Sequence, residues 1–261
     1  MRLLETSAGP VAAVFRRSVR EGLRDPGPAL FLPVLPPLLL VIAMTSLFGR
    51  LGGVIEFPTG SFEEFFIPGA ILIVAIAGGG FTSAQVAEDL RSGFMDRLRL
   101  QVPNPRSLLL GRYGFEAIRI IPGIAIVLGT GLLFGGALPN GLPGALTISV
   151  LAMLLSAAYA SLFYIAAIIT ADPQTPLNLN PLGIIIAFLS TAFIPRAAMP
   201  DWADAVAGFN PMTVIVDGAR AAMIGDLTSR TVVAAFAVAA AGVVLGMAAS
   251  GAVLTRKLSR G

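Results

Sequence analysis

The chain has 261 residues, of which 56% are hydrophobic and only 13% are charged, and its formal net charge is +3. Soluble domains carry about 25% charged residues, so this composition indicates a membrane protein. The chain has no cysteine and no histidine, which excludes disulfides, thiolate and imidazole metal sites, and mechanisms that need a histidine base. We identify no catalytic, cofactor-binding or metal-binding residue.

ATP hydrolysis is also not expected of this chain. Its single lysine, Lys257, lies near the C-terminus with no glycine-rich loop before it. A Walker loop, which holds the phosphates of a nucleotide, needs the pattern G-x-x-x-x-G-K-[ST]. Any energy from ATP would have to come from a partner.

Six apolar segments are long enough to cross about 30 Å of hydrocarbon as helices. The sequence therefore predicts an all-α, polytopic, single-domain membrane protein. An N-terminal signal peptide is not expected, because Glu5 and a polar stretch precede the first apolar run. The prolines between Pro33 and Pro37 predict a kinked or irregular opening of the first span. The six expected spans are residues 29–49, 67–87, 114–136, 144–169, 180–198 and 231–254.

A shorter amphipathic helix is expected before the first span, over residues 10–25. Its apolar side chains recur every fourth residue, and its arginines fall on the other side of the helix. Such a helix suits the membrane interface, lying flat, better than a disordered basic tail. The apolar row is Val11, Phe15, Val19 and Leu23, and the basic row is Arg16, Arg17, Arg20 and Arg24.

Residues 88–112 form a charged segment between two apolar spans, with five arginines and three acids. Leu90, Phe94 and Leu98 recur every four residues, which predicts an amphipathic helix over about 88–100, ended by Pro103 and Pro105. Two interpretations stay open: a surface that binds a partner protein, or an ordinary loop next to the membrane. The mixed signs of charge argue against a simple binding patch for anionic lipid.

The arginines also predict the orientation in the membrane. Six spans place both termini and the charged segment on one side. That side holds 14 of the 18 basic residues, and the other side holds only Arg50, Arg196, Arg220 and Arg230. Basic residues accumulate on the cytoplasmic side, so both termini are expected in the cytoplasm.

On the outer side, residues 199–226 predict a helix too short to span. Asn210 suits the N-cap, Pro211 the first helical position and Gly225 the C-terminal stop. The helix over 211–224 is expected to be re-entrant or interfacial, with Trp202 at the level of the headgroups.

Two pairs of opposite charge are spaced three residues apart. Glu116 and Arg119 are expected to form a pair that extends towards the membrane surface, and a contact with substrate is the minority interpretation. Asp217 and Arg220 are expected to form a structural pair in the outer helix.

Four ordered stretches resemble the membrane subunits of ABC-2 type exporters, especially the daunorubicin-resistance permease group. One runs into an E-x-x-x-G turn, here Asp89 to Gly93. The others are similar to the family patterns "rL..lPvsr...l.gR", "lSgaFvP...mP.W" and "lnPlT..vdalR". The four stretches are FFIPGAILIVAIAGGGFTSAQVAEDLRSG (65–93), MDRLRLQVPNPRSLLLGRY (95–113), FLSTAFIPRAAMPDW (188–202) and FNPMTVIVDGAR (209–220).

The resemblance implies a multidrug or antibiotic efflux permease in a prokaryotic plasma (inner) membrane. It implies a complex of two permeases, identical or homologous, with two ATP-binding subunits that hold ATP and magnesium. The charged segment would provide the coupling helix that docks on the ATPase. The coupling residues would be Glu88, Asp89, Arg91, Gly93, Asp96, Arg97 and Arg99. The outer helix and lid would use Pro195, Pro200, Asn210, Pro211, Asp217 and Arg220.

We therefore expect export of an amphipathic drug-like or lipid-like molecule, with no nucleic acid as a partner. The alternative is a secondary transporter coupled to protons or sodium. Such carriers usually place ionisable residues at the middle of the membrane, whereas the centres of the expected spans lack acids and histidines. A membrane enzyme is the weakest interpretation, because no cluster of carboxylates or histidines is present.

Overall fold

The computed structural model describes residues 8–48, 59, 61–99 and 106–260. Within these ranges every regular element is a helix and no strand occurs, so the expected all-α fold is confirmed. Five helical stretches are long and apolar enough to cross a membrane, and they correspond to the first four and the last of the expected spans. They are Gly27–Phe48, Phe62–Arg91, Arg106–Leu133, Gly141–Thr170 and Arg230–Ser259.

Three of these stretches are interrupted helices, whereas two are continuous. The continuous ones are α8 (Gly141–Thr170) and α13 (Arg230–Arg260). The interrupted ones are η1 and α2 (Gly27–Phe31, Leu32–Phe48), α3 and α4 (Phe62–Ala77, Gly79–Arg91), and α6 and α7 (Arg106–Arg119, Ile121–Leu133).

The first stretch opens irregularly, as its prolines predict. η1 is a π-helical turn, and α2 follows it with Pro36 and Pro37 inside the helix. Each proline lacks the N–H that would bond four residues back, so the regular α-helical pattern cannot run through this segment unbroken. Phe31 and Leu32 are 66% and 60% exposed, as expected for side chains that meet lipid.

The prediction of one continuous helix over residues 180–198 is wrong. The chain instead forms α9 (Gln174–Leu179) and α10 (Pro181–Phe188), then turns and a 3-10 helix, η3 (Arg196–Ala198). Pro181 supplies no N–H at the junction, and Pro195 begins the last turn from an extended conformation. α10 has eight residues and is therefore about 12 Å long, which is too short for it to cross the membrane alone.

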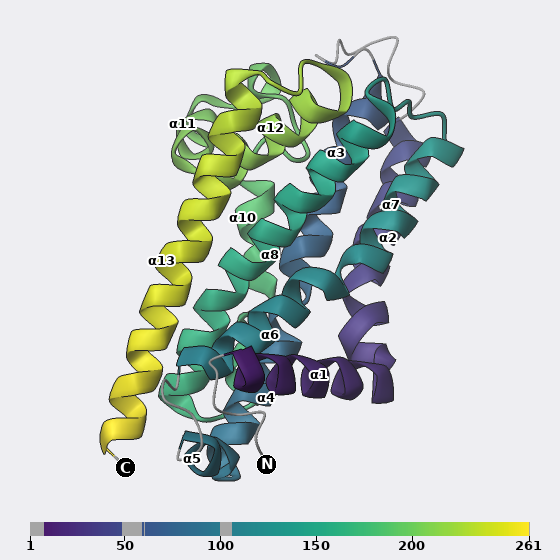
Figure 1. The fold of residues 1–261 in the computed structure, drawn as a ribbon. Coiled ribbons are helices and arrows are strands. Elements are labelled where there is room, and N and C mark those ends of the chain that lie inside the picture. The colour runs from purple at the N-terminus through teal and green to yellow at the C-terminus, as the bar shows by residue number, and fades with distance from the viewer. Residues whose placement is uncertain (1–7, 49–58, 60, 100–105, 261) are drawn as a thin grey trace.

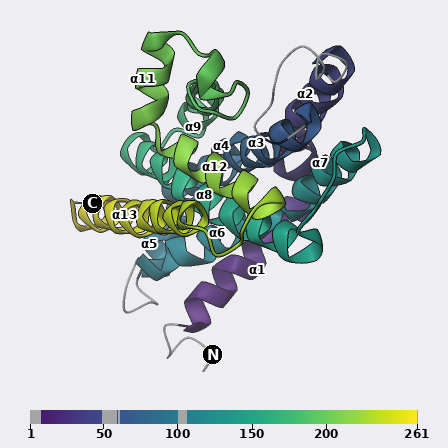
Figure 2. The same cartoon turned by 90° about the horizontal axis from the view of Figure 1, so that it is seen from above.

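The two ends of the bundle differ in character (Figure 1). At one end α1 (Ala8–Arg24) lies across the spans, and α5 (Phe94–Arg99) and the C-terminal end of α13 lie at the same end. At the other end lie α11 (Asp201–Phe209) and α12 (Pro211–Ile224). The bounds of α12 agree with the short helix predicted over residues 211–224. In the view from above, α2 and α7 lie at the periphery, and α8 and α12 lie near the middle (Figure 2).

The helix expected over residues 10–25 is present as α1, and it has a face that its sequence pattern does not reveal. Val14, Ser18 and Gly22 are buried, and α1 packs on α6. The crossing is close, because a β-carbon at Gly111 of α6 would lie 2.6 Å from the carbonyl oxygen of Val11. Val14, Ser18 and Gly22 therefore form the side of α1 that packs against α6.

The largest buried apolar cluster surrounds α3, which is buried along nearly its whole length. α8 and α12 contribute side chains such as Leu151, Ile148 and Val216 to it. A second cluster, nearer the α1 end, joins α4, α6, α8 and α13 around Tyr113 and Tyr164. Packing within these two clusters holds the helices together, and the same helices carry the buried polar side chains of the candidate site.

Candidate functional site

The charged segment begins with a sharp turn rather than with one helix. α4 ends at Arg91, Gly93 takes a φ of +66°, and α5 starts at Phe94. A positive φ is easily adopted by glycine, which ends α4 and changes the direction of the chain. The single amphipathic helix predicted over 88–100 is therefore wrong. Residues 100–105, with Pro103 and Pro105, lie outside the described part of the chain.

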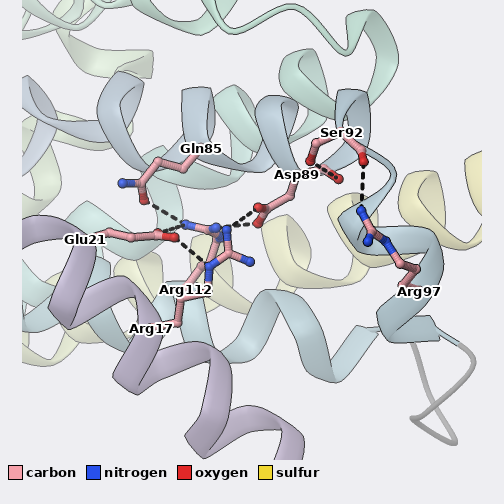
Figure 3. Close-up of polar contacts among 7 residues, drawn as sticks. All are labelled: Arg17, Glu21, Gln85, Asp89, Ser92, Arg97 and Arg112. Carbon is pink, nitrogen blue, oxygen red and sulfur yellow. Dashed lines mark hydrogen bonds and ion pairs between the residues drawn. The ribbon is translucent and has the colours of Figure 1, made fainter.

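Asp89, expected among the coupling residues, is buried inside the protein. It is 5% exposed and accepts hydrogen bonds from two guanidinium groups. Arg17 Nη2 of α1 donates to Oδ1 over 2.6 Å, and Arg112 Nη2 of α6 donates to Oδ2 (Figure 3). Asp89 thus binds neighbouring helices of the same chain and presents no charge to a partner, which corrects the expectation.

Arg112 completes a network of two cations and two carboxylates. It is 1% exposed, its Nη1 donates to Gln85 over 2.7 Å, and Nη1 lies 3.6 Å from Glu21 Oε2. Glu21 also accepts from Arg17 Nε over 2.6 Å. The charges balance, which a buried ionic group requires if it is not to destabilise the fold strongly. The sequence analysis did not predict this network. The only signal in the sequence is the spacing of four residues between Arg17 and Glu21 and between Gln85 and Asp89.

Arg17 also connects the network to α5. Its guanidinium carbon lies 3.9 Å from the centre of the Phe94 ring, in the geometry of a cation–π contact. Burial alone would lower the pKa of Arg17, but Asp89 and Glu21 more than offset that effect and raise it above its ordinary value. Arg17 therefore stays charged, and it links α1 to both sides of the Gly93 turn.

Three other predicted coupling residues are exposed near this turn. Glu88 and Arg91 are exposed on the last turn of α4, and Arg97 is exposed on α5. Arg97 Nη2 donates to the carbonyl oxygen of Ser92 over 3.3 Å (Figure 3). Its Nε donates to the carbonyl oxygen of Gly93 over 3.4 Å. α5 includes the backbone of Asp96 and Arg99, and their side chains lie outside what the structure describes.

A second ionic pair lies deeper in the bundle. Glu116 and Arg119 pair as predicted, but they are 0% and 4% exposed, so the expected extension to the membrane surface is wrong. Thr82 donates to Glu116 Oε2 over 2.6 Å, and Ser156 donates to Oε1 over 2.9 Å. Four donated bonds from three side chains therefore satisfy the carboxylate.

The interruptions of three helices are close to this pair. α3 and α4 are interrupted at Gly78, where a β-carbon would lie 2.0 Å from Arg119 Nη1. Asn180, between α9 and α10, donates to the carbonyl oxygen of Ala77 over 2.7 Å. α6 gives way to α7 at Ile120, next to Arg119. Arg119 thus packs against the backbone, and Asn180 donates a hydrogen bond to it, where helical bonding is interrupted.

At the opposite end, Arg220 of α12 binds the chain that follows α10. It pairs with Asp217 over 3.1 Å, as predicted, and its Nε donates to the carbonyl oxygen of Phe65 over 2.9 Å. Its Nη2 donates to the carbonyl oxygen of Thr191, and its guanidinium carbon lies 3.7 Å from the centre of the Phe65 ring. The sequence predicted the salt bridge of Arg220, but not that this side chain joins α12 to α3 and to the segment after α10.

Asn210 is the N-cap of α12, as predicted. Its side-chain oxygen accepts from the N–H of Met212 over 2.9 Å. Its Nδ2 donates to the carbonyl oxygens of Ile186 and Leu189, each over 2.8 Å. One side chain therefore starts α12 and satisfies the end of α10. The prolines of this region lie where helices begin: Pro195 precedes η3, Pro200 precedes α11, and Pro211 is the first residue of α12.

An apolar groove of about 420 Å³ lies along α8 and α13 and extends to α12. Leu155, Ile215 and Leu245 are among its apolar side chains, and Tyr159 and Ser161 are its polar ones. Among the described residues, no group of three or more carboxylates could hold a metal ion. The groove can accept a mainly apolar molecule.

The long apolar helices define an all-α, polytopic membrane protein. Residues 10–224 match the sequence model of the ABC-2 type transporter, and the chain belongs to this family. It is thus the membrane component of an ABC transporter, which works with ABC ATP-binding subunits and is not itself an enzyme.

Curated relatives agree with this assignment. The chain is 24% identical over 193 residues to the "Daunorubicin resistance ABC transporter permease protein DrrB1" of Streptomyces coeruleorubidus, covering 74% of this chain and 67% of that one. It is 25% identical over 190 residues to the "Probable doxorubicin resistance ABC transporter permease protein DrrC" of Mycobacterium tuberculosis, covering 72% and 68%. A "Putative transport permease ycf38" of Cyanophora paradoxa is 24% identical over 188 residues, covering 72% and 65%. No solved structure matches the chain.

Proposed function

We propose that the chain exports an amphipathic drug-like or lipid-like molecule across a prokaryotic plasma membrane, as one of two permeases joined to two ATP-binding subunits. The observation that carries the proposal is family membership together with relatives named for daunorubicin and doxorubicin resistance. The groove along α8 and α13 supports a mainly apolar substrate, because most of its lining side chains are hydrocarbon.

The ATPase binds, in this proposal, at the turn between α4 and α5. Glu88, Arg91 and Arg97 are exposed there, at the same end of the bundle as α1 and the C-terminus. The excess of basic residues at this end supports a cytoplasmic location.

Asp89 has a different role in this proposal: it transmits motion. It fixes the last turn of α4 to α1 and α6 through Arg17 and Arg112. A displacement of α5 by the ATPase would therefore move three helices together, since buried ion pairs and the Phe94 contact join them. α4 continues towards the interruption at Gly78, where the deeper Glu116–Arg119 pair lies.

The test is co-purification of the tagged permease with its ATP-binding subunit, expressed together. We expect Glu88→Lys, Arg91→Glu and Arg97→Glu, combined, to abolish recovery of the ATPase while the permease remains folded. Arg230→Glu, an exposed charge at the start of α13, is the control and should retain recovery. Equal recovery of the ATPase with both variants would refute docking at this turn.

The alternative expected from the sequence, an ion-coupled carrier, requires an ionisable group inside the membrane, and one such group is present. Glu116 is a buried acid within a long apolar helical stretch, whereas the sequence predicted it near the cytoplasmic start of a span. Its pairing with Arg119 favours a structural role, because a carboxylate that binds protons in turn must lose and regain its charge. Drug efflux from vesicles that continues without ATP, and stops when the proton gradient is collapsed, would favour the carrier.

A further inference from the structure

The arginines of α1 are not equivalent in the structure. Arg17 is bonded to Glu21 and Asp89, whereas Arg16, Arg20 and Arg24 are exposed. These three form no ion pair with any residue in the described part of the chain. The buried network already balances its own charges. A row of three exposed arginines without an ion-pair partner among the described residues therefore remains on the surface of α1.

The row also has a defined shape. At about 100° per residue, Arg16, Arg20 and Arg24 lie within about 80° of the helix circumference. Together with Ala13, Arg17 and Glu21 they line a surface concavity of about 450 Å³.

The side of α1 next to the row is apolar and open. Leu23 is 68% exposed, and Ala12 is exposed while Val19 is partly exposed. The chain then leads through η1 to Phe31 and Leu32, which are also exposed and apolar. α1 thus has three faces: one buried on α6, one apolar and one basic. A helix with an apolar and a basic open face matches the boundary between acyl chains and headgroups.

We propose that Arg16, Arg20 and Arg24 form a binding site for anionic phospholipid headgroups in the leaflet that α1 contacts. The phosphodiester and the acidic headgroup would lie against the guanidinium row, since arginine binds phosphate through paired N–H donors. The acyl chains would run past Leu23 towards η1 and α2. The charged segment at 88–112 differs because it mixes both signs of charge, whereas the α1 row is uniformly basic.

The site would connect lipid composition to the proposed coupling region. Arg17 lines the same concavity and also bonds Asp89, at the end of α4. A lipid anion beside Arg17 would compete with Asp89 for that guanidinium. This connection depends on the proposed function, whereas the lipid site itself does not.

The experiment measures lipid selectivity of the full-length permease in nanodiscs made of equal parts phosphatidylglycerol and phosphatidylcholine. Native mass spectrometry after release into detergent gives the ratio of the two lipids that stay bound. We expect Arg16→Gln, Arg20→Gln and Arg24→Gln, combined, to lower the phosphatidylglycerol preference by between about tenfold and about a hundredfold, since each basic residue near an anionic surface contributes at most roughly fivefold. The same three positions changed to lysine should retain a clear preference.

A matched control removes three charges elsewhere: Arg230→Gln, Arg256→Gln and Lys257→Gln, all exposed positions. It should lower the phosphatidylglycerol preference far less than the α1 variant does, because none of these residues lines the concavity. An equal ratio for the wild type and the α1 variant would overturn the proposal, as would an equal loss in the control. A thermal melt of each variant verifies that it is folded.

Co-purification with the ATP-binding subunit, measured on the same variants, separates this proposal from the proposed function. Loss of the ATPase with an unchanged lipid ratio would assign the α1 row to protein docking and overturn the lipid site. Loss of lipid selectivity with the ATPase retained supports the lipid site alone. If the Glu88, Arg91 and Arg97 variants keep the ATPase while the α1 variant loses lipid selectivity, only the docking proposal fails.

Discussion

The guanidinium of Arg119 lies directly against Gly78, so closely that a β-carbon at position 78 would be 2.0 Å from Arg119 Nη1. The glycine leaves the space that the arginine fills at the interruption between α3 and α4. Arg119 in turn neutralises Glu116. Backbone shape and buried charge therefore depend on each other at this level of the bundle.

Gly78→Ala should destabilise the permease by about 3 kcal/mol. The added methyl group must displace Arg119 and disturb its pair with Glu116, and overpacking a filled site costs about 1–3 kcal/mol even without a charge. The measurement is the free energy of unfolding in detergent or bicelles, followed by circular dichroism. Gly129→Ala in α7 is the control, because no atom lies within 4 Å of its β-carbon. A Gly78→Ala protein as stable as the control would contradict this account.

Much of the fold could be predicted from the sequence, because apolar length is a strong signal in a membrane protein. Five of the six expected spans coincide with long apolar helices, and α12 was predicted with the right bounds. The cap at Asn210 was also predictable, since asparagine followed by proline is a local signal. These features depend on residues near one another in the chain.

The candidate site was less predictable because it depends on contacts between distant residues. Asp89 and Arg17 are 72 positions apart, and Asp89 and Arg112 are 23 apart. A charge next to an apolar span has the same appearance in a sequence whether it faces water or a buried partner. The apolar periodicity also concealed the Gly93 turn, because Leu90, Phe94 and Leu98 keep a helical spacing across it, whereas the resemblance to the E-x-x-x-G pattern pointed to a turn there.

Asp89→Asn should destabilise the fold by about 3 kcal/mol, because Arg17 and Arg112 would then face one carboxylate, that of Glu21. Removing one partner of a buried ion pair typically costs about 3–5 kcal/mol. Glu88→Gln is the neighbouring control, and as an exposed side chain it should change the free energy of unfolding by less than about 0.5 kcal/mol. Thermal unfolding of the two purified variants measures their stability. Equal stability of the two variants would show that Asp89 does not stabilise the fold through Arg17 and Arg112.

Replacing Glu116 alone should lower the free energy of unfolding more than replacing both Glu116 and Arg119. Glu116→Gln leaves Arg119 buried and charged, at an expected cost of about 3 kcal/mol or more. Glu116→Gln combined with Arg119→Met removes both charges and should recover a large part of that loss. Unfolding free energies of the two single variants and the double variant form a double-mutant cycle. Additive effects would show that the two side chains do not stabilise each other.

Asn210 permits two functions of one side chain to be separated. Asn210→Ala loses the cap of α12 and both hydrogen bonds to α10, and should cost about 2–3 kcal/mol. Asn210→Ser keeps an oxygen that can accept from Met212 but has no amide to reach Ile186 and Leu189, so it should recover only about 1 kcal/mol. Hydrogen exchange at the backbone amides of residues 189–194 should increase with both substitutions, because the segment after α10 loses its link to α12. Full recovery of stability and protection with serine would mean that the cap alone matters and that the two bonds to α10 contribute nothing.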